Sequence, residues 1–152
     1  MFVHRVGDLF TTSLPAIGHG VNTHGVMGSG IARIIAGRFP AVLAPYKEAC
    51  ATGALTPGGF QAVKVREDPD LFIFNLASQQ RPGKDARLEW LEQSVEKAVS
   101  YAKENGFFGF ALPRIGAGIG GLDWESEVRP ALEVIADRED TLTIELWSLP
   151  DA

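Results

Sequence analysis

The chain has one cysteine and three histidines. These low numbers argue against a disulfide within the chain and against a metal site. Cys50 is alone, so no disulfide can form within one chain, and the simplest interpretation is a small buried side chain. The histidines His4, His19 and His24 form no HxxxH or HExxH set. We therefore expect neither a bound metal nor a cofactor.

Runs of positive charge and long apolar runs are missing as well. The net charge is -5 and the pI is about 5.2. Phosphate contacts need clustered Lys and Arg, so we expect no binding of nucleic acid by bulk charge. Without a signal peptide or an apolar run long enough to span a bilayer, we expect a cytoplasmic protein that makes no membrane contact. The length of 152 residues, 45% of them hydrophobic, fits one domain over 1–152 with a full core.

Apolar segments alternate with helical patterns along the chain. Strands are expected over 1–6, 16–22, 59–65, 70–78, 107–115 and 141–149, with 70–78 and 107–115 central, and a hairpin turn is expected over 66–70. Helices are expected from a Ser29 cap to Pro40, over 41–53, from an Asp85 cap to Asn105-Gly106, and over 123–138 with a kink or a start near Pro130. This alternation predicts an α/β fold whose sheet has helices on both faces.

Two glycine-rich loops follow expected strands and precede expected helices. Residues 25–30 read GVMGSG, without the lysine of a common phosphate loop, and residues 116–121 read GAGIGG. Ligands of such folds bind where strands end and helices begin, where backbone N–H groups can hold an anion. The second loop matches GxGxxG but stands too late in the chain for a dinucleotide fold. Together the loops predict a pocket that holds a diphosphate from two sides, unless both are only tight turns.

Five stretches, in their order and spacing, resemble the macrodomain family of ADP-ribose-binding proteins over nearly the whole chain. They are VGDLF (6–10), VNTHGVMGSGIA (21–32), CATGALTPGGF (50–60), PRIGAGIGGLDW (113–124) and LWSL (146–149). The resemblance is to the branch with terminal ADP-ribose protein glycohydrolase, the macrodomain of the chromatin remodeller "amplified in liver cancer" and bacterial DNA-ADP-ribosyl glycohydrolases. It implies a three-layer α/β/α sandwich with a mixed central sheet.

The resemblance also implies where each part of ADP-ribose binds. Asp8 would accept a hydrogen bond from the adenine amino group and the Leu9 backbone would bond a ring nitrogen, while Trp147 and Leu149 would flank the base. A turn-stabilising Asp8 and a Trp147 that only packs remain alternatives.

The two loops would hold the diphosphate between the adenine and the distal ribose. Their implied contacts are Gly28, Ser29, Gly30 and Ile31 in the first loop, and Ile115, Gly116, Ala117, Gly118, Ile119 and Gly120 in the second. Asn22 would meet the hydroxyls of the distal ribose, or it caps its own turn. Arg114 is expected to be a buried partner of a carboxylate rather than a ligand.

Hydrolases of this branch use a lysine and an aspartate that this sequence lacks. Ser78-Gln79-Gln80 stands where the lysine would be, and Gly120 where the aspartate would be. Lys84 is expected to face water, and Asp123 to cap a helix rather than act as a base. Asn22, Ser78, Gln79 and Arg81 are the polar residues predicted to orient a water molecule.

Three functions follow from the resemblance. The leading hypothesis is a hydrolase that releases mono-ADP-ribose from acidic side chains of modified proteins by metal-free attack of water. The alternatives are a module that only binds ADP-ribose or ADP-ribosylated protein, and a phosphatase of ADP-ribose 1''-phosphate. The acidic balance and the missing lysine disfavour an activity on DNA.

Overall fold

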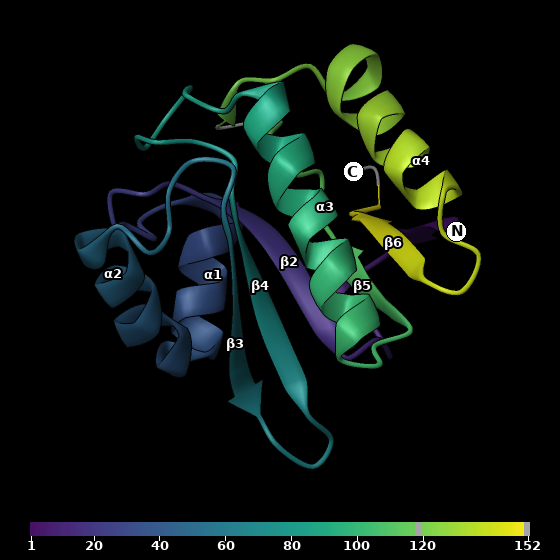
Figure 1. Ribbon diagram of the computed structural model, residues 1–152, viewed down its shortest axis with the longest axis horizontal. Coiled ribbons are helices and arrows are strands. Elements are labelled where there is room, and N and C mark those ends of the chain that lie inside the picture. The colour runs from purple at the N-terminus through teal and green to yellow at the C-terminus, as the bar shows by residue number, and fades with distance from the viewer. Residues whose placement is uncertain (118–119, 151–152) are drawn as a thin grey trace.

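The computed structural model describes residues 1–117 and 120–150, and its centre is one six-stranded sheet (Figure 1). The strands are β1 (Phe2–Val6), β2 (Ala16–Val21), β3 (Phe60–Arg66), β4 (Leu71–Ala77), β5 (Gly109–Leu112) and β6 (Thr143–Ser148). Their order across the sheet is β1-β6-β5-β2-β4-β3. All neighbours are parallel except β3, which pairs antiparallel with β4. The prediction of a mixed sheet is confirmed.

Helices cover both faces of this sheet. They are α1 (Gly30–Arg38), α2 (Leu43–Thr52), α3 (Leu88–Glu104) and α4 (Arg129–Asp137), with short segments η1 (Leu9–Thr11), η2 (Pro40–Val42) and a π-helical η4 (Trp124–Val128). Ile35 of α1 and Tyr46 of α2 belong to one apolar core, whereas Leu91 of α3 and Leu132 of α4 belong to the other. The predicted three-layer α/β/α sandwich is therefore confirmed. None of the described helices has both the length and the apolar character that a membrane crossing requires.

Of two predicted helix caps, Ser29 is confirmed in position only and Asp85 is wrong. Ser29 occupies the N-cap position of α1, but its side chain makes no capping hydrogen bond. Asp85 does not cap α3, because that helix begins at Leu88 and Arg87 stands at its N-cap. The Asp85 carboxylate instead accepts hydrogen bonds from the N–H groups of Gln80 and Arg81 at 3.0 and 2.9 Å. The Asp85 side chain thus stabilises the loop before α3 rather than the start of the helix.

The sheet order decides which loops meet. β2 lies between β4 and β5, and all three run parallel, so the loops that follow them leave the same edge of the sheet. The predicted strand 107–115 is shorter than expected, because β5 ends at Leu112 and Pro113, which has no N–H to donate, begins the loop. β1 and β6, also parallel, end beside these loops.

Candidate functional site

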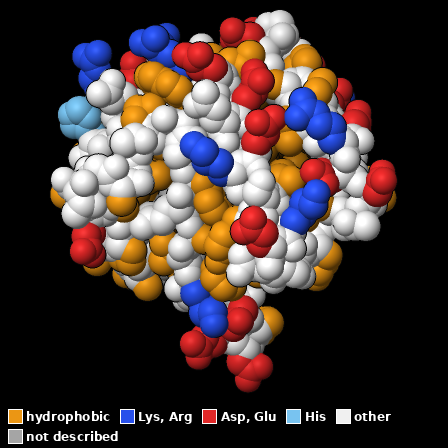
Figure 2. Space-filling model, in the orientation of Figure 1, with side chains coloured by type: hydrophobic (Ala, Val, Ile, Leu, Met, Phe, Trp, Pro, Cys, Tyr) orange, Lys and Arg blue, Asp and Glu red, His pale blue; other side chains and the backbone are white. Residues whose placement is uncertain are grey.

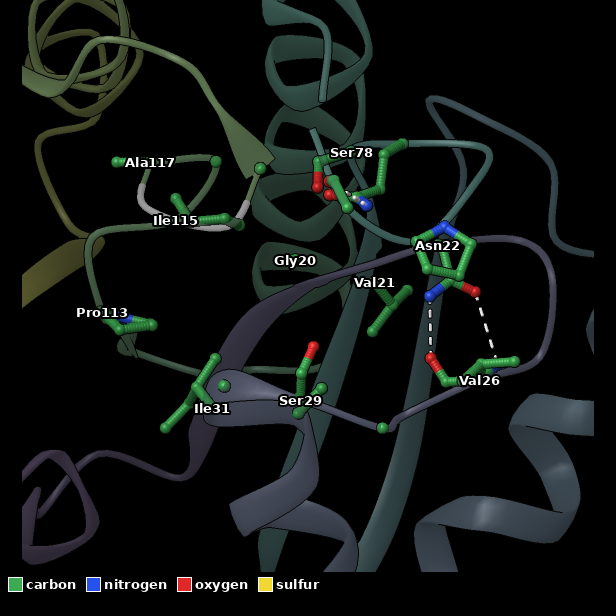
Figure 3. A pocket seen from close by; sticks show the side chains of 18 of the residues that line it. Gly20, Val21, Asn22, Val26, Ser29, Ile31, Ser78, Pro113, Ile115 and Ala117 are labelled. Carbon is green, nitrogen blue, oxygen red and sulfur yellow. Dashed lines mark hydrogen bonds between the residues drawn. The ribbon is translucent and has the colours of Figure 1, made fainter. Parts of the chain in front are cut away.

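The two glycine loops line one cavity of about 470 Å³ at this edge of the sheet. In Figure 3, Asn22 and Val26 lie on one side of the cavity and Ile115 and Ala117 on the opposite side, with Ser78 and Ser29 above and below. Backbone hydrogen bonds join the loops: Thr23 N donates to Gln80 O at 3.1 Å, and Ala86 N donates to Gly120 O at 3.2 Å. The cavity is therefore built by three connected loops and not by one turn.

Asn22 follows β2, and its amide is used within its own turn. Its Nδ2 donates to Val26 O at 2.7 Å, and its Oδ1 accepts from Val26 N at 3.3 Å (Figure 3). The same Oδ1 also accepts from His24 N at 3.0 Å. The Tyr46 hydroxyl, fully buried in α2, donates to Asn22 O at 2.6 Å. Nδ2 keeps a second hydrogen for a ligand, so turn capping and ligand contact are compatible at Asn22. Cys50 beside it is half-buried, and burial raises the pKa of its thiol, which disfavours a reactive thiolate.

The start of α1 offers donors to the cavity. Gly30 adopts a positive φ of 59°, which a glycine tolerates and other residues rarely do. The first N–H groups of a helix have no partner within it, and they point to where an anion can bind. Gly28, Ser29, Gly30 and Ile31 all line the cavity. Because the Ser29 hydroxyl makes no capping bond and points into the cavity in Figure 3, it is free to donate there as well.

The second loop lies across the cavity from α1. Ile115, Gly116, Ala117 and Gly120 line the cavity, and Gly116 has a positive φ of 79°. Gly118 and Ile119, predicted for the same role, lie outside the described residues. Gly120 stands where the relatives' aspartate was expected, and a Cβ there would lie 3.5 Å from Gln79 Oε1.

Ser78 and Gln79 bring uncharged polar groups to the cavity. Ser78 is 1% exposed, and its Oγ has no hydrogen-bond partner among the described residues. The Gln79 amide nitrogen donates to the carbonyl oxygens of Arg81 and Gly83, the latter at 3.0 Å. Those two bonds orient the amide and leave Gln79 Oε1 as an acceptor.

Other predicted catalytic positions are not brought into this cavity. Arg81 is exposed and does not line it, and Lys84 faces solvent as expected. Asp123 caps η4 by accepting a hydrogen bond from Ser126 N at 2.9 Å. The N–H and hydroxyl of Ser126 hold the pKa of Asp123 below its usual range, which makes it a poor general base.

A second cavity, of about 790 Å³, adjoins the first. It is lined by the predicted adenine residues Asp8, Leu9, Trp147 and Leu149. Asp8 Oδ1 accepts from Phe10 N at 2.9 Å, so Asp8 stabilises its turn as the alternative predicted, while the residue also lines the cavity. Both volumes lie within the range of small-molecule sites.

The two cavities share four lining residues, Gly30, Ile31, Pro113 and Arg114. The prediction of a buried Arg114 paired with a carboxylate is wrong. Arg114 is exposed, its guanidinium carbon lies 5.7 Å from the centre of the Trp124 ring, and it has no ion pair within the described residues. The early end of β5 explains this, because Arg114 stands in the loop and not in the central strand. The junction of the cavities thus has a cationic residue and the N-terminus of α1.

Comparisons with known proteins give consistent matches for this chain. The family model of the Macro domain matches residues 19–131. The DNA ADP-ribosyl glycohydrolase of Mycobacterium tuberculosis is 29% identical over 152 residues, which cover 99% of this chain but only 40% of that protein. The ADP-ribose 1''-phosphate phosphatase of Candida albicans is 31% identical over 140 residues, which cover 82% of this chain and 88% of that protein.

The fold also matches that of a solved structure. The macrodomain of Mycobacterium tuberculosis DarG superposes with a TM-score of 0.88 at 27% sequence identity, and the match covers 99% of each chain.

Proposed function

Because this chain belongs to the macrodomain family, we propose that it binds ADP-ribose in the two joined cavities and hydrolyses the bond that links the distal ribose to a carrier. One observation carries the proposal. Two glycine loops from distant parts of the sequence converge on a cavity that continues into a second cavity, and the helix N-terminus lies at their junction. An elongated site with anion-binding amides at its middle suits a nucleotide whose diphosphate lies between two rings.

In the proposed pose, adenine occupies the cavity with Asp8, Leu9, Trp147 and Leu149. The Asp8 carboxylate selects adenine by accepting from its amino group, since a base without that donor leaves the acceptor unpaired. The diphosphate lies against Gly28 to Ile31 and the second glycine loop, where Arg114 adds a positive charge.

The distal ribose then lies between Asn22 and Ser78 in the smaller cavity. Water attacks the anomeric carbon, the bond from that carbon to the carrier oxygen breaks, and the leaving carboxylate keeps the bonding electrons while the water releases its proton to solvent. Asn22, Ser78 and Gln79 orient the water and the ribose. No strong base faces this end among the described residues, and general acid–base catalysis is typically worth about 10²- to 10⁴-fold in rate. We therefore expect a slow hydrolase that relies on positioning.

We propose acidic side chains of modified proteins as the carrier, because the acyl–ribose bond is labile enough to be cleaved without a strong base. The relative in Mycobacterium tuberculosis is named for action on DNA, but this chain spans only 40% of it.

A second carrier, DNA, is favoured by one surface feature. Arg81, Lys84 and Arg87 are exposed on the segment between β4 and α3, beside the distal end of the cavity, and none forms an ion pair with another described residue. Figure 2 shows Lys or Arg side chains and a His side chain gathered at the upper left, where Figure 1 places this segment. Such a local group attracts phosphates even on a chain of net negative charge.

The decisive experiment offers the purified protein two substrates in parallel. One is a transferase automodified with mono-ADP-ribose on Glu and Asp, and the other is single-stranded DNA carrying mono-ADP-ribose. Release of ADP-ribose from the protein supports the leading proposal, and release from DNA alone supports the second carrier. Binding without release from either identifies a reader, and phosphate release from ADP-ribose 1''-phosphate identifies the phosphatase.

A charge variant sharpens the choice of carrier. Arg81→Glu with Lys84→Glu slows release from DNA and leaves release from protein unchanged if DNA is the carrier. Lys64→Glu with Arg66→Glu, near the hairpin end of β3, is the matched control because it makes the same change of charge far from the cavity.

A further inference from the structure

Glu145 is a buried carboxylate whose two oxygens connect three segments around the larger cavity. It lies on β6 and is 5% exposed. Its Oε1 accepts hydrogen bonds from Thr12 Oγ1 at 2.6 Å and from Trp147 Nε1 at 3.0 Å. Its Oε2 accepts from Arg5 Nε at 3.2 Å on the neighbouring strand β1. Glu145 itself lines neither cavity.

The bond to Trp147 fixes one wall of that cavity. An indole N–H has a single donor direction, so a partner at Nε1 sets the rotation of the ring. Gly7 lies against the ring at the other side, since a Cβ on Gly7 would be 3.5 Å from Trp147 Cζ3. The aromatic face that lines the cavity is thus held by a carboxylate at one edge of the ring and by a glycine at another.

The bond to Thr12 fixes a second part of the cavity lining. Thr12 ends the short η1 segment, and its N–H donates to Leu9 O at 3.2 Å. Asp8 caps the start of the same segment. Because these bonds hold the turn together, the position of Thr12 also determines the position of the Asp8 and Leu9 backbone, which lines the cavity.

We propose that Glu145 is the positioning residue of the nucleobase end: it sets the separation and orientation of the Trp147 ring and the Asp8–Leu9 backbone, and so controls affinity for the base. The inference rests on the proposed function. It gives Glu145 no contact with the ligand and no part in the bond cleavage at the distal ribose.

The ionised form of Glu145 is what these bonds require. Burial alone would raise the pKa of its carboxyl, but hydrogen bonds from Thr12, Trp147 and Arg5 hold that pKa below its usual range. Charge-assisted hydrogen bonds are roughly twice as strong as neutral ones. Replacing the carboxylate by an amide of the same size therefore loosens both walls without leaving a cavity.

The test compares ligands with and without a base. We expect Glu145→Gln, Thr12→Val and Trp147→Phe each to weaken binding of ADP-ribose and of AMP by the same factor, roughly 5- to 10-fold. Binding of inorganic pyrophosphate should not change. In turnover, KM should rise while kcat stays within about twofold, because the affected end is remote from the reacting carbon.

Arg5→Gln is the matched control. It removes the third partner of Glu145, an Arg side chain that is 55% exposed, and leaves both wall contacts in place. Its affinity for AMP should equal that of the wild-type protein.

The inference is overturned if the three variants bind AMP as tightly as the wild-type protein, or if pyrophosphate binding falls by the same factor. Should Glu145→Gln not fold, Thr12→Val decides the matter, because it removes one bond, keeps the carboxylate and leaves the Trp147 ring unchanged. A wild-type protein that binds no ADP-ribose would instead refute the proposed function itself, and the inference with it.

Discussion

Gly20, on β2, leaves the space that the Ser78 hydroxyl occupies. A Cβ at Gly20 would lie 2.7 Å from Ser78 Oγ and 3.2 Å from Ile115 Cγ1. Ser78 is the buried hydroxyl without a partner, so its position bears directly on the proposed ribose end of the site. The absence of one methyl group at Gly20 thus sets the geometry of a residue almost sixty positions later in the chain.

We predict that Gly20→Ala displaces the Ser78 hydroxyl, lowers the free energy of unfolding by about 1 to 3 kcal/mol and reduces hydrolysis. The control is Gly37→Ala in α1, where no atom lies within 4 Å of the added Cβ. That helical substitution should stabilise the protein by up to about 1 kcal/mol. Urea denaturation and single-turnover hydrolysis measure both effects, and equal behaviour of the two variants would contradict the assignment.

Tyr46→Phe tests the support beneath Asn22. The Tyr46 hydroxyl donates to Asn22 O at 2.6 Å, and burial raises the pKa of this phenol, so it remains a donor at neutral pH. Its loss leaves Asn22 O with only the weak thiol donor of Cys50 at 4.0 Å, which should cost about 1 to 2 kcal/mol of stability. ADP-ribose affinity, measured by calorimetry, should fall roughly 3- to 10-fold because the first glycine loop loosens.

Tyr101→Phe provides the comparison. Tyr101 packs among Phe60, Phe74 and Phe107, and its hydroxyl forms no hydrogen bond among the described residues. Unchanged affinity in Tyr101→Phe with weakened affinity in Tyr46→Phe is the expected pair of results. If both variants keep the wild-type affinity, Asn22 does not depend on Tyr46.

Sequence reasoning selected Asp8 and Trp147 by their place in motifs, and Ser78 and Gln79 because they stand where related hydrolases have a lysine. All four line the two cavities. Their roles stay predictions. Tyr46 was missed because nothing in the sequence shows which helix packs under Asn22.

At the scale of elements, a network of hydrogen-bonded polar side chains crosses three strands, with His19 and Asn75 buried and Gln61 partly buried. His19 of β2 lies 2.7 Å from Asn75 Oδ1 of β4, and Asn75 Nδ2 donates to Gln61 Oε1 of β3 at 3.0 Å. Gln61 Nε2 then donates to Pro45 O of α2 at 3.0 Å. Because Asn75 uses its nitrogen toward Gln61, its oxygen faces His19, whose Nε2 must therefore carry the proton.

Because His19 is buried in this network, we predict that the stability of the protein depends on pH. Burial lowers the pKa of His19 from 6.5 to about 4. Between these values the unfolded chain binds a proton that the folded chain does not, so stability falls as the pH falls from 6.5 toward 4. We expect a loss of about 2 to 3 kcal/mol between pH 7 and pH 4.5.

Denaturation of the wild-type protein and of His19→Gln at both pH values measures this contribution. The Gln amide can still donate to Asn75 but does not titrate, so the variant should lose less stability over the same range. A variant with the wild-type slope would exclude His19 as the source.

The elements themselves were largely predictable, and their ends were not. Alternating apolar segments gave all six strands and the four main helices. The prediction that Asp85 caps α3 was wrong. An acidic residue just before a helix is typical of an N-cap, but the Asp85 carboxylate accepts hydrogen bonds from the N–H groups of Gln80 and Arg81 instead. Similarly, Arg114 was placed in a strand that Pro113 brings to an end.

At the scale of the whole molecule, the order of the strands in the sheet could not be predicted from the residue patterns. Alternation predicts a layered fold, but the antiparallel β3 and the order β1-β6-β5-β2-β4-β3 depend on long-range packing. The mixed sheet came from the family resemblance alone, which the Macro domain match confirms.

The proposed ligand would contact segments from nearly the whole length of the chain, from Asp8 to Leu149. ADP-ribose at 100 times its dissociation constant should stabilise the fold by about 2.7 kcal/mol, which raises Tm by roughly 5 to 10 °C. AMP at the same concentration should give a smaller shift, because it reaches only the nucleobase end. A thermal scan with both ligands checks this, and equal shifts would contradict the extended pose.

The position of β1 has a consequence for biosynthesis. Within the described residues β1 pairs with β6 alone, and Phe2 stands opposite Ile144. While the polypeptide emerges from the ribosome, β1 has no partner strand until β6 has been translated. Asp8 and Trp147 therefore come together only after the other strands are available, which makes the nucleobase end the last part of the site to mature.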